Sequence, residues 1–120
     1  MRVGTMVRGA AIAACVAMTA GAASAEWGAV GIDTTGDGYG WSAGYTYESD
    51  AYNRVWNECG GYCDQIFTFY NECAAISQAS NGAWGWSTGG NRGSAESGAL
   101  SWCRQYGGRD CYIRVWACSG

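Results

Sequence analysis

Aromatic and apolar residues alternate with other residues between positions 39 and 47, where every second residue is Tyr39, Trp41, Ala43, Tyr45 and Tyr47. This period of two predicts a β-strand. The apolar segment 27–32 precedes it, and the intervening residues 33–38 are rich in Asp, Thr and Gly, which favour turns. Residues 27–47 are therefore predicted to form a β-hairpin.

The period then changes to that of a helix, because apolar residues recur every fourth position from Ala51 to Cys59. Ser49 or Asp50 is the predicted cap at its start, and two glycines stop it after Cys59. The run 65–70 is rich in aromatic and β-branched residues and apolar on both faces, which predicts a central strand.

The second half of the chain repeats this order. The stretch 39–44 recurs 45 positions later as 84–89, and the apolar positions of the helix recur 44 positions later, among them Ala95 and Cys103. The predicted elements of this half are a hairpin, a helix capped by Ser94 and a last strand, over residues 74–89, 95–103 and 112–116.

A unit that recurs with its cysteines is a structural module whose spacing is set by packing and cross-links. We predict an α+β fold made of two tandem β-β-α-β units, at about residues 27–71 and 72–119, with mainly antiparallel strands and two helices. One unit alone could not bury both faces of its last strand. The two units are therefore expected to be fused into a single disulfide-stabilised domain, residues 26–120, with approximate two-fold symmetry.

The first 25 residues have the pattern of a secretory signal peptide. Arg2 and Arg8 precede a short uncharged apolar stretch, and Ala23-Ser24-Ala25 is an A-x-A cleavage site. That stretch is shorter than the roughly 20 residues that cross a bilayer, so a membrane-spanning helix is the weaker interpretation. Cys15 leaves open a lipoprotein signal in which it would be acylated, but cleavage before Glu26 is favoured. The mature domain is expected to be secreted or periplasmic, without membrane insertion.

The predicted mature segment 26–120 is acidic. It holds five Arg against ten Asp and Glu, and no Lys or His, so its formal net charge is −5. This charge repels phosphate backbones and anionic lipid headgroups, which argues against nucleic-acid and membrane-surface binding. Its seven Trp, eight Tyr and two Phe argue against disorder, because disordered chains are poor in aromatic residues.

Cleavage removes Cys15 and leaves six cysteines, an even number that suits an exported, cross-linked domain. All six are predicted to form disulfides, and six cysteines allow 15 pairings. Requiring the repeat to map onto itself leaves fewer than half of these. Among them we favour Cys59–Cys63, Cys103–Cys111 and Cys73–Cys118, because two would tie a helix end to the next strand and one would join the unit ends.

Several short motifs carry a resemblance to one bacterial family. They are Trp27-Gly28-Ala29-Val30, Gly-x-Gly-Trp-Ser-x-Gly at 38–44 and in looser form at 83–89, the cysteines at the helix ends and before the last strands, and Val115-Trp116-Ala117-Cys118. In order and spacing they resemble the domain of unknown function 4189, over essentially the whole mature segment. The resemblance implies a small exported bacterial protein. It carries over no reaction, because that family has no established catalytic residues.

The residue types that this chain lacks restrict its chemistry. Without His it has no Ser-His or Cys-His pair and no zinc site of the usual catalytic kind, and without Lys it has no Ser-Lys pair or Schiff base. The carboxylates available for a glycoside hydrolase are Asp33, Asp37, Glu48 and Asp50. Their spacing singles out no pair, so we interpret them as turn and cap residues and assign no catalytic residue.

The segment 33–38 also has features of a calcium loop, with Asp at positions one and five and Gly at position six. Gly44 stands at position twelve, however, where the loop requires Glu. As an aspartic-protease motif, Asp-Thr-Thr-Gly has one residue too many. A hairpin turn explains the segment better. The cysteines do not repeat one ligand spacing, so neither a metal site nor a cofactor is predicted.

The many aromatic residues admit two roles. Trp and Tyr dominate binding hot spots, but their alternation with Gly favours a core, and the equivalent Trp41 and Trp86 are both predicted to be buried. We expect a non-enzymatic extracytoplasmic module that binds a protein, a glycan or an envelope component. The alternatives are a carboxylate-dependent glycan or peptidoglycan hydrolase and a structural or stress-related secreted protein.

Overall fold

The computed structural model describes residues 26–120, so the predicted signal peptide and Cys15 lie outside the described residues. The first unit consists of β2 (Trp27–Ile32), β3 (Tyr39–Tyr45), α3 (Glu48–Glu58) and β4 (Gln65–Tyr70). The second consists of β5 (Cys73–Gln78), β6 (Trp84–Gly89), α4 (Arg92–Gln105) and β7 (Tyr112–Cys118). The predicted α+β order of two β-β-α-β units is confirmed.

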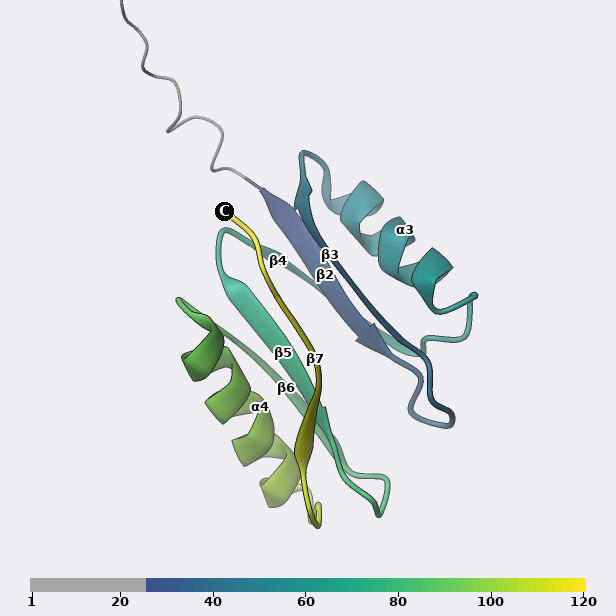
Figure 1. Cartoon of the computed structure of the whole chain (residues 1–120), viewed down its shortest axis with the longest axis vertical. Coiled ribbons are helices and arrows are strands. Elements are labelled where there is room, and N and C mark those ends of the chain that lie inside the picture. The colour runs from purple at the N-terminus through teal and green to yellow at the C-terminus, as the bar shows by residue number, and fades with distance from the viewer. Residues whose placement is uncertain (1–25) are drawn as a thin grey trace, which may run out of the picture.

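The two units stack as four layers (Figure 1). Each contributes one three-stranded antiparallel sheet, in the orders β3-β2-β4 and β6-β5-β7. The sheets face each other, while α3 covers the outer face of the first and α4 the outer face of the second. The two ends of the described chain also meet, because the Gly120 N–H donates to Glu26 Oε1 at 3.1 Å. The pseudo-two-fold domain is thus a helix–sheet–sheet–helix sandwich.

The central strands β2 and β5 bury both faces by alternating larger and smaller side chains. Val30 and Ile76 lie between the sheets, in the main hydrophobic core. Ala29 packs against α3 and Ala75 against α4, where a small side chain lets each helix approach its sheet. Burial of both faces is expected for strands that have neighbours on both sides and layers above and below.

The prediction that residues 65–70 form a central strand is wrong. β4 lies at the edge of its sheet, as β7 does in the other, and the first strand of each unit is central instead. β4 is apolar on both faces because Phe69 lies between the sheets while Ile66 packs against the cluster beneath α3. An edge strand covered by a helix therefore has the same pattern as a central one.

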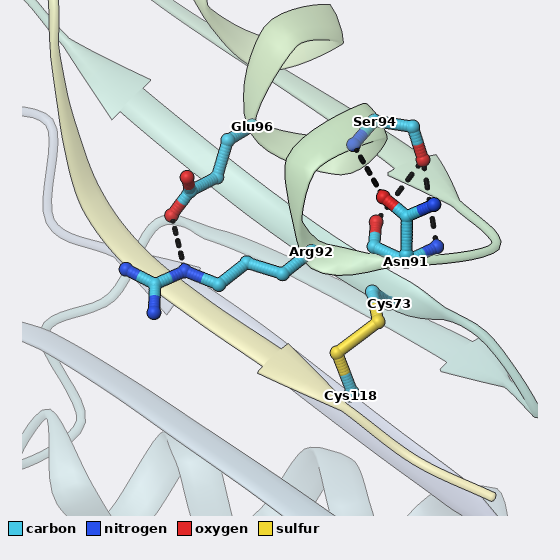
Figure 2. A network of polar contacts seen from close by, with 6 residues as sticks. All are labelled: Cys73, Asn91, Arg92, Ser94, Glu96 and Cys118. Carbon is cyan, nitrogen blue, oxygen red and sulfur yellow. Dashed lines mark hydrogen bonds and ion pairs between the residues drawn. A yellow bond between two sulfur atoms is a disulfide. The ribbon is translucent and has the colours of Figure 1, made fainter.

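The predicted helix caps are also corrected. α3 begins at Glu48, so Ser49 and Asp50 lie inside its first turn, and no side chain caps it. In α4 the cap is Asn91 rather than Ser94, as Figure 2 shows: Asn91 Oδ1 accepts a hydrogen bond from the Ser94 N–H at 2.9 Å. Ser94 is the third residue of a capping box, with its hydroxyl facing the Asn91 backbone. The polar cap therefore lies three residues earlier than predicted.

Three disulfides close the fold, and they have the connectivity that the repeat favours: Cys59–Cys63, Cys103–Cys111 and Cys73–Cys118. The first two are local, with sequence separations of 4 and 8. The third spans 45 residues and joins the first residue of β5 to the last residue of β7, beneath the first turn of α4 (Figure 2). It fastens the end of the chain to the second sheet.

The prediction that Trp41 and Trp86 are both buried is wrong, and the two differ. Trp86 is half-buried and stacks on Phe67 of β4, with ring centroids 4.0 Å apart and an interplanar angle of 5°. Trp41 is 54% exposed. Val30 pairs with Phe67 in the first sheet as Ile76 pairs with Val115 in the second. Across the sandwich β3 faces β7, which has Val115 at this position, whereas β6 faces β4, which has Phe67.

We expect Trp41→Ala to change the free energy of unfolding by less than about 1 kcal/mol, since its ring is largely solvated. Trp86→Ala should lower it by about 2 kcal/mol, because a half-buried ring and its stacking partner are lost. Urea unfolding of both variants measures the difference. Equal losses would contradict this asymmetry between the units.

Candidate binding groove

A groove of about 730 Å³ follows β6. Its lining comes from β4, from β6 with the turn before it, and from α4. The lining residues are Gln65, Phe67, Gly82, Ala83, Trp84, Gly85, Trp86, Ser87, Thr88, Trp102 and Tyr106. One strand of the first unit and two consecutive elements of the second therefore meet around one hollow.

The floor of the groove is the free edge of β6. All residues from 82 to 88 line it, although alternate side chains of a strand point to opposite faces of its sheet. Only the edge of a strand touches every residue in succession. Among the described strands β6 pairs with β5 alone, so its other edge leaves backbone N–H and C=O groups without a neighbouring strand.

One wall is formed by the C-terminal half of α4. The buried stripe of α4 is Ala95, Ala99 and Cys103, and Trp102 and Tyr106 lie beside that stripe, one helical turn apart. Their rings stack with centroids 5.9 Å apart, yet they remain 46% and 69% exposed. The helix thus holds two ordered aromatic rings next to the groove with much of their surface uncovered.

Close contact between α4 and β6 fixes the position of this wall. A Cβ atom at Gly85 would lie 2.5 Å from the Cys103 backbone nitrogen and 2.6 Å from the Ala99 carbonyl oxygen. Beneath the same turn, the Ser77 hydroxyl donates to the Ala99 carbonyl at 2.6 Å. The glycine and the buried serine therefore let the helix lie directly on the strand, which places Trp102 at the groove.

The opposite wall comes from the other sheet. Phe67 of β4 stacks on Trp86 and lies at a tilt to Trp84, with a centroid distance of 5.9 Å. This aromatic contact joins the edges of the two sheets on the groove side of the sandwich. The rings on this wall are half-buried and packed against the main core, so the wall is held in place.

The groove has no formal charge. Its lining contains no Asp, Glu, Lys or Arg, and its polar side chains are Gln65, Ser87 and Thr88. The Ser87 hydroxyl already donates to the Thr88 carbonyl at 3.2 Å. A charged group placed here would be desolvated without an ionic partner, which is costly. The arrangement suits an uncharged ligand with apolar or aromatic surface.

The carboxylates considered from the sequence fall into two distant pairs. Asp33 and Asp37 lie in the turn before β3, and Glu48 and Asp50 lie in the first turn of α3 after it. The seven residues of β3 separate these pairs by about 20 Å at the rise of a strand. Carboxylates of glycoside hydrolases lie about 5–9.5 Å apart. The structure therefore does not bring the two pairs together.

Two of these side chains, Asp33 and Glu48, instead have local partners. Asp33 Oδ1 accepts a hydrogen bond from the Thr35 N–H at 2.9 Å within the predicted turn. The Asp33 N–H closes this turn by donating to the Gly38 carbonyl, also at 2.9 Å. Glu48 Oε2 accepts from the Thr68 hydroxyl at 2.6 Å. Asp64 accepts hydrogen bonds from the hydroxyl and the N–H of Thr34, and these bonds lower the pKa of its carboxyl. Asp64 is thus held in its ionised form, unlike a general acid.

Two features are absent from residues 26–120. No three His, Cys, Asp or Glu side chains in this range gather where they could hold one metal ion. In the same range, no helix combines the length and apolar character needed to cross a membrane.

The sequence did not single out the groove. From the sequence, the aromatic residues were predicted to form the core, and nothing grouped Phe67, Trp102 and Tyr106 together. One local signal was present: Trp102 and Tyr106 lie four residues apart but outside the apolar stripe of their helix. Two large rings beside a stripe of small residues indicate a surface that the core does not use.

Comparison with known proteins supports the architecture. The structure is similar to the NMR structure of Rv1813c from Mycobacterium tuberculosis, with a TM-score of 0.57 and 27% identity over 78% of this chain and 74% of that chain. No curated protein matches the sequence. The family model described as "Domain of unknown function (DUF4189)" matches residues 27–118. This match spans nearly all of the described domain and agrees with the resemblance seen in the short motifs, so the chain belongs to the DUF4189 family.

Proposed function

We propose that this protein is a non-enzymatic binding module that acts outside the cytoplasm and recognises a protein, glycan or envelope component through the groove along β6. One observation carries the proposal: five aromatic rings from three elements surround a single uncharged groove. They are Phe67, Trp84, Trp86, Trp102 and Tyr106.

The physical properties of the rings support binding. Aromatic side chains bury a large area for few rotatable bonds, which is why Trp and Tyr are enriched in hot spots. Trp102 and Tyr106 are already stacked on each other, so a ligand would not have to order them. Their exposed surface is apolar area that a ligand would remove from water.

Two features support a site of action outside the cytoplasm. The first 25 residues have the n-region, the apolar stretch and the cleavage site of a signal peptide. Three disulfides join the six remaining cysteines, and such bonds persist in oxidising compartments. The hydrolase alternative gains no comparable support, because its candidate carboxylates form two pairs at opposite ends of β3, and Asp33 and Glu48 bind their own neighbours.

The proposal predicts that partner capture depends on the exposed wall of the groove. The exported protein is immobilised and incubated with envelope and culture-medium fractions of its bacterium. The double variant Trp102→Ala/Tyr106→Ala should reduce recovery of the specific partner by about tenfold or more, since hot-spot rings contribute most of the affinity.

A matched control is available on the other helix. Trp56 and Tyr62 are 42% and 75% exposed, which is similar to the exposures of Trp102 and Tyr106, but Trp56 lies on α3 and Tyr62 in the segment that follows it, outside the groove. Trp56→Ala/Tyr62→Ala should retain the partner at the wild-type level. Equal loss in both double variants, or no loss in the groove variant, would contradict the proposal.

A further inference from the structure

The groove contains a feature that indicates what kind of partner it binds. Resting on the proposed function, we propose that the groove takes up an extended, uncharged polypeptide segment, which adds to β6 as a fourth strand of the second sheet. The free edge of β6 and the charges around it carry this proposal.

The other three sheet edges each have a feature that discourages strand addition. β7 carries Arg114 and a register shift in its pairing with β5. The pairing of β3 with β2 is also shifted. Beside β4, the Glu48 carboxylate binds the Thr68 hydroxyl. Charges and bulges are the devices by which proteins protect edge strands.

β6 has neither of these devices. Its six residues pair with β5 without a register shift, and none of them is charged or proline. The groove runs along the edge itself rather than over one face. Residues 82–88 span about 20 Å at the rise of a strand, which corresponds to a bound segment of about six residues. Alternate side chains of that segment would contact the β4 wall and the α4 wall.

The polar groups of the groove favour a polypeptide over a glycan. Besides the indole N–H groups and the Tyr106 hydroxyl, the lining offers three polar side chains, one of them already bonded to the backbone. The unpaired N–H and C=O groups along the edge of β6 form a continuous row, and they complement the alternating donors and acceptors of an extended peptide. Peptides that add to a sheet gain affinity from such backbone bonds and specificity from alternate side-chain pockets.

Charge complementarity selects a foreign segment over a second copy of this chain. Two copies paired through β6 would bring together two domains that each have a formal net charge of −5. If the part of the partner that lies in the groove is uncharged, it can contact the uncharged lining without the cost of desolvating an ion. Basic residues on either side of that segment would be attracted by the acidic domain, so the expected partner has a neutral apolar core between basic flanks.

The probe is a displayed library of random peptides about twelve residues long. Binders are selected on the immobilised exported protein, and the selected peptides are then synthesised. Their affinity is measured with each backbone amide N-methylated in turn. We expect N-methylation at every second position of the core to weaken binding about tenfold, because it removes a backbone hydrogen bond, and the intervening positions to change it less than about threefold. Trp102→Ala/Tyr106→Ala should weaken binding of the parent peptides, and Trp56→Ala/Tyr62→Ala should not.

A parallel arm uses soluble uncharged glucan and chitin oligosaccharides. One outcome separates the two proposals: the oligosaccharides bind, Trp102→Ala/Tyr106→Ala abolishes that binding, and no groove-dependent peptide is selected. In that case the proposed binding function stands and the strand-addition proposal is overturned. Peptides whose N-methyl scan lacks the period of two would also overturn strand addition. If neither peptides nor oligosaccharides show groove-dependent binding, the strand-addition proposal is overturned, and the capture experiment with Trp102→Ala/Tyr106→Ala alone decides the proposed function.

Discussion

Replacing Cys73 and Cys118 together by alanine is expected to lower the free energy of unfolding by about 4 kcal/mol. Replacing Cys59 and Cys63 together should lower it by about 2 kcal/mol. The difference follows from loop length, because the first disulfide joins residues 45 apart in sequence and the second joins residues 4 apart. The longer loop removes more conformational freedom from the unfolded chain.

Urea unfolding of the protein and of both double variants, without reductant, measures this difference. Removing both cysteines of a pair avoids a free thiol that could exchange with the remaining disulfides. Equal losses, or a larger loss from the Cys59/Cys63 variant, would show that the long-range bond does not have the stabilising role assigned to it.

A second large effect is expected at Gly85, where α4 lies on β6. A Cβ atom there would be 2.5–2.7 Å from the Cys103 nitrogen, the Ala99 carbonyl oxygen and the Trp102 Cβ. Two of these are backbone atoms that cannot rotate away, so the helix must lift from the strand. We expect Gly85→Ala to lower the free energy of unfolding by about 3 kcal/mol, at the upper end of the usual range for overpacking.

Gly90 provides the control for the Gly85 substitution. It follows β6 directly, and a Cβ atom there would have no neighbour within 4 Å. Gly90→Ala should therefore change the free energy of unfolding by less than about 0.5 kcal/mol. Thermal or urea unfolding of the two variants gives the comparison. If Gly85→Ala were as mild as Gly90→Ala, the close approach of α4 that positions Trp102 would be refuted.

Much of the fold could be predicted from the sequence because the two halves carry the same local patterns. Alternation predicted the hairpin at 27–47, and the helical period and the glycines after it located α3. The repeat also reduced the possible cysteine pairings to fewer than half, and the connectivity favoured among them is the one seen in the structure. The order of strands in each sheet was not predicted, because β4, covered by α3 on its outer face, has the apolar pattern of a central strand.

The differences between the halves, and the groove, depend on contacts across the sandwich. Trp41 and Trp86 are equivalent in sequence, but only Trp86 meets a phenylalanine on the facing strand. The groove likewise requires Phe67 from the first unit and Trp102 from the second. Periodicity describes one element at a time, so it gave no indication that these side chains come together. The candidate groove therefore became visible only with the arrangement of the two units.

We propose that the uncharged aromatic groove along β6 is where this protein binds its partner. Chemical-shift mapping tests this most directly, in a titration of the nitrogen-15-labelled protein with the partner recovered by capture. We predict that the largest changes fall on the backbone amides of residues 82–88 and on the indole N–H of Trp102. Changes concentrated on α3 and around Trp56, with the amides of β6 unaffected, would contradict it.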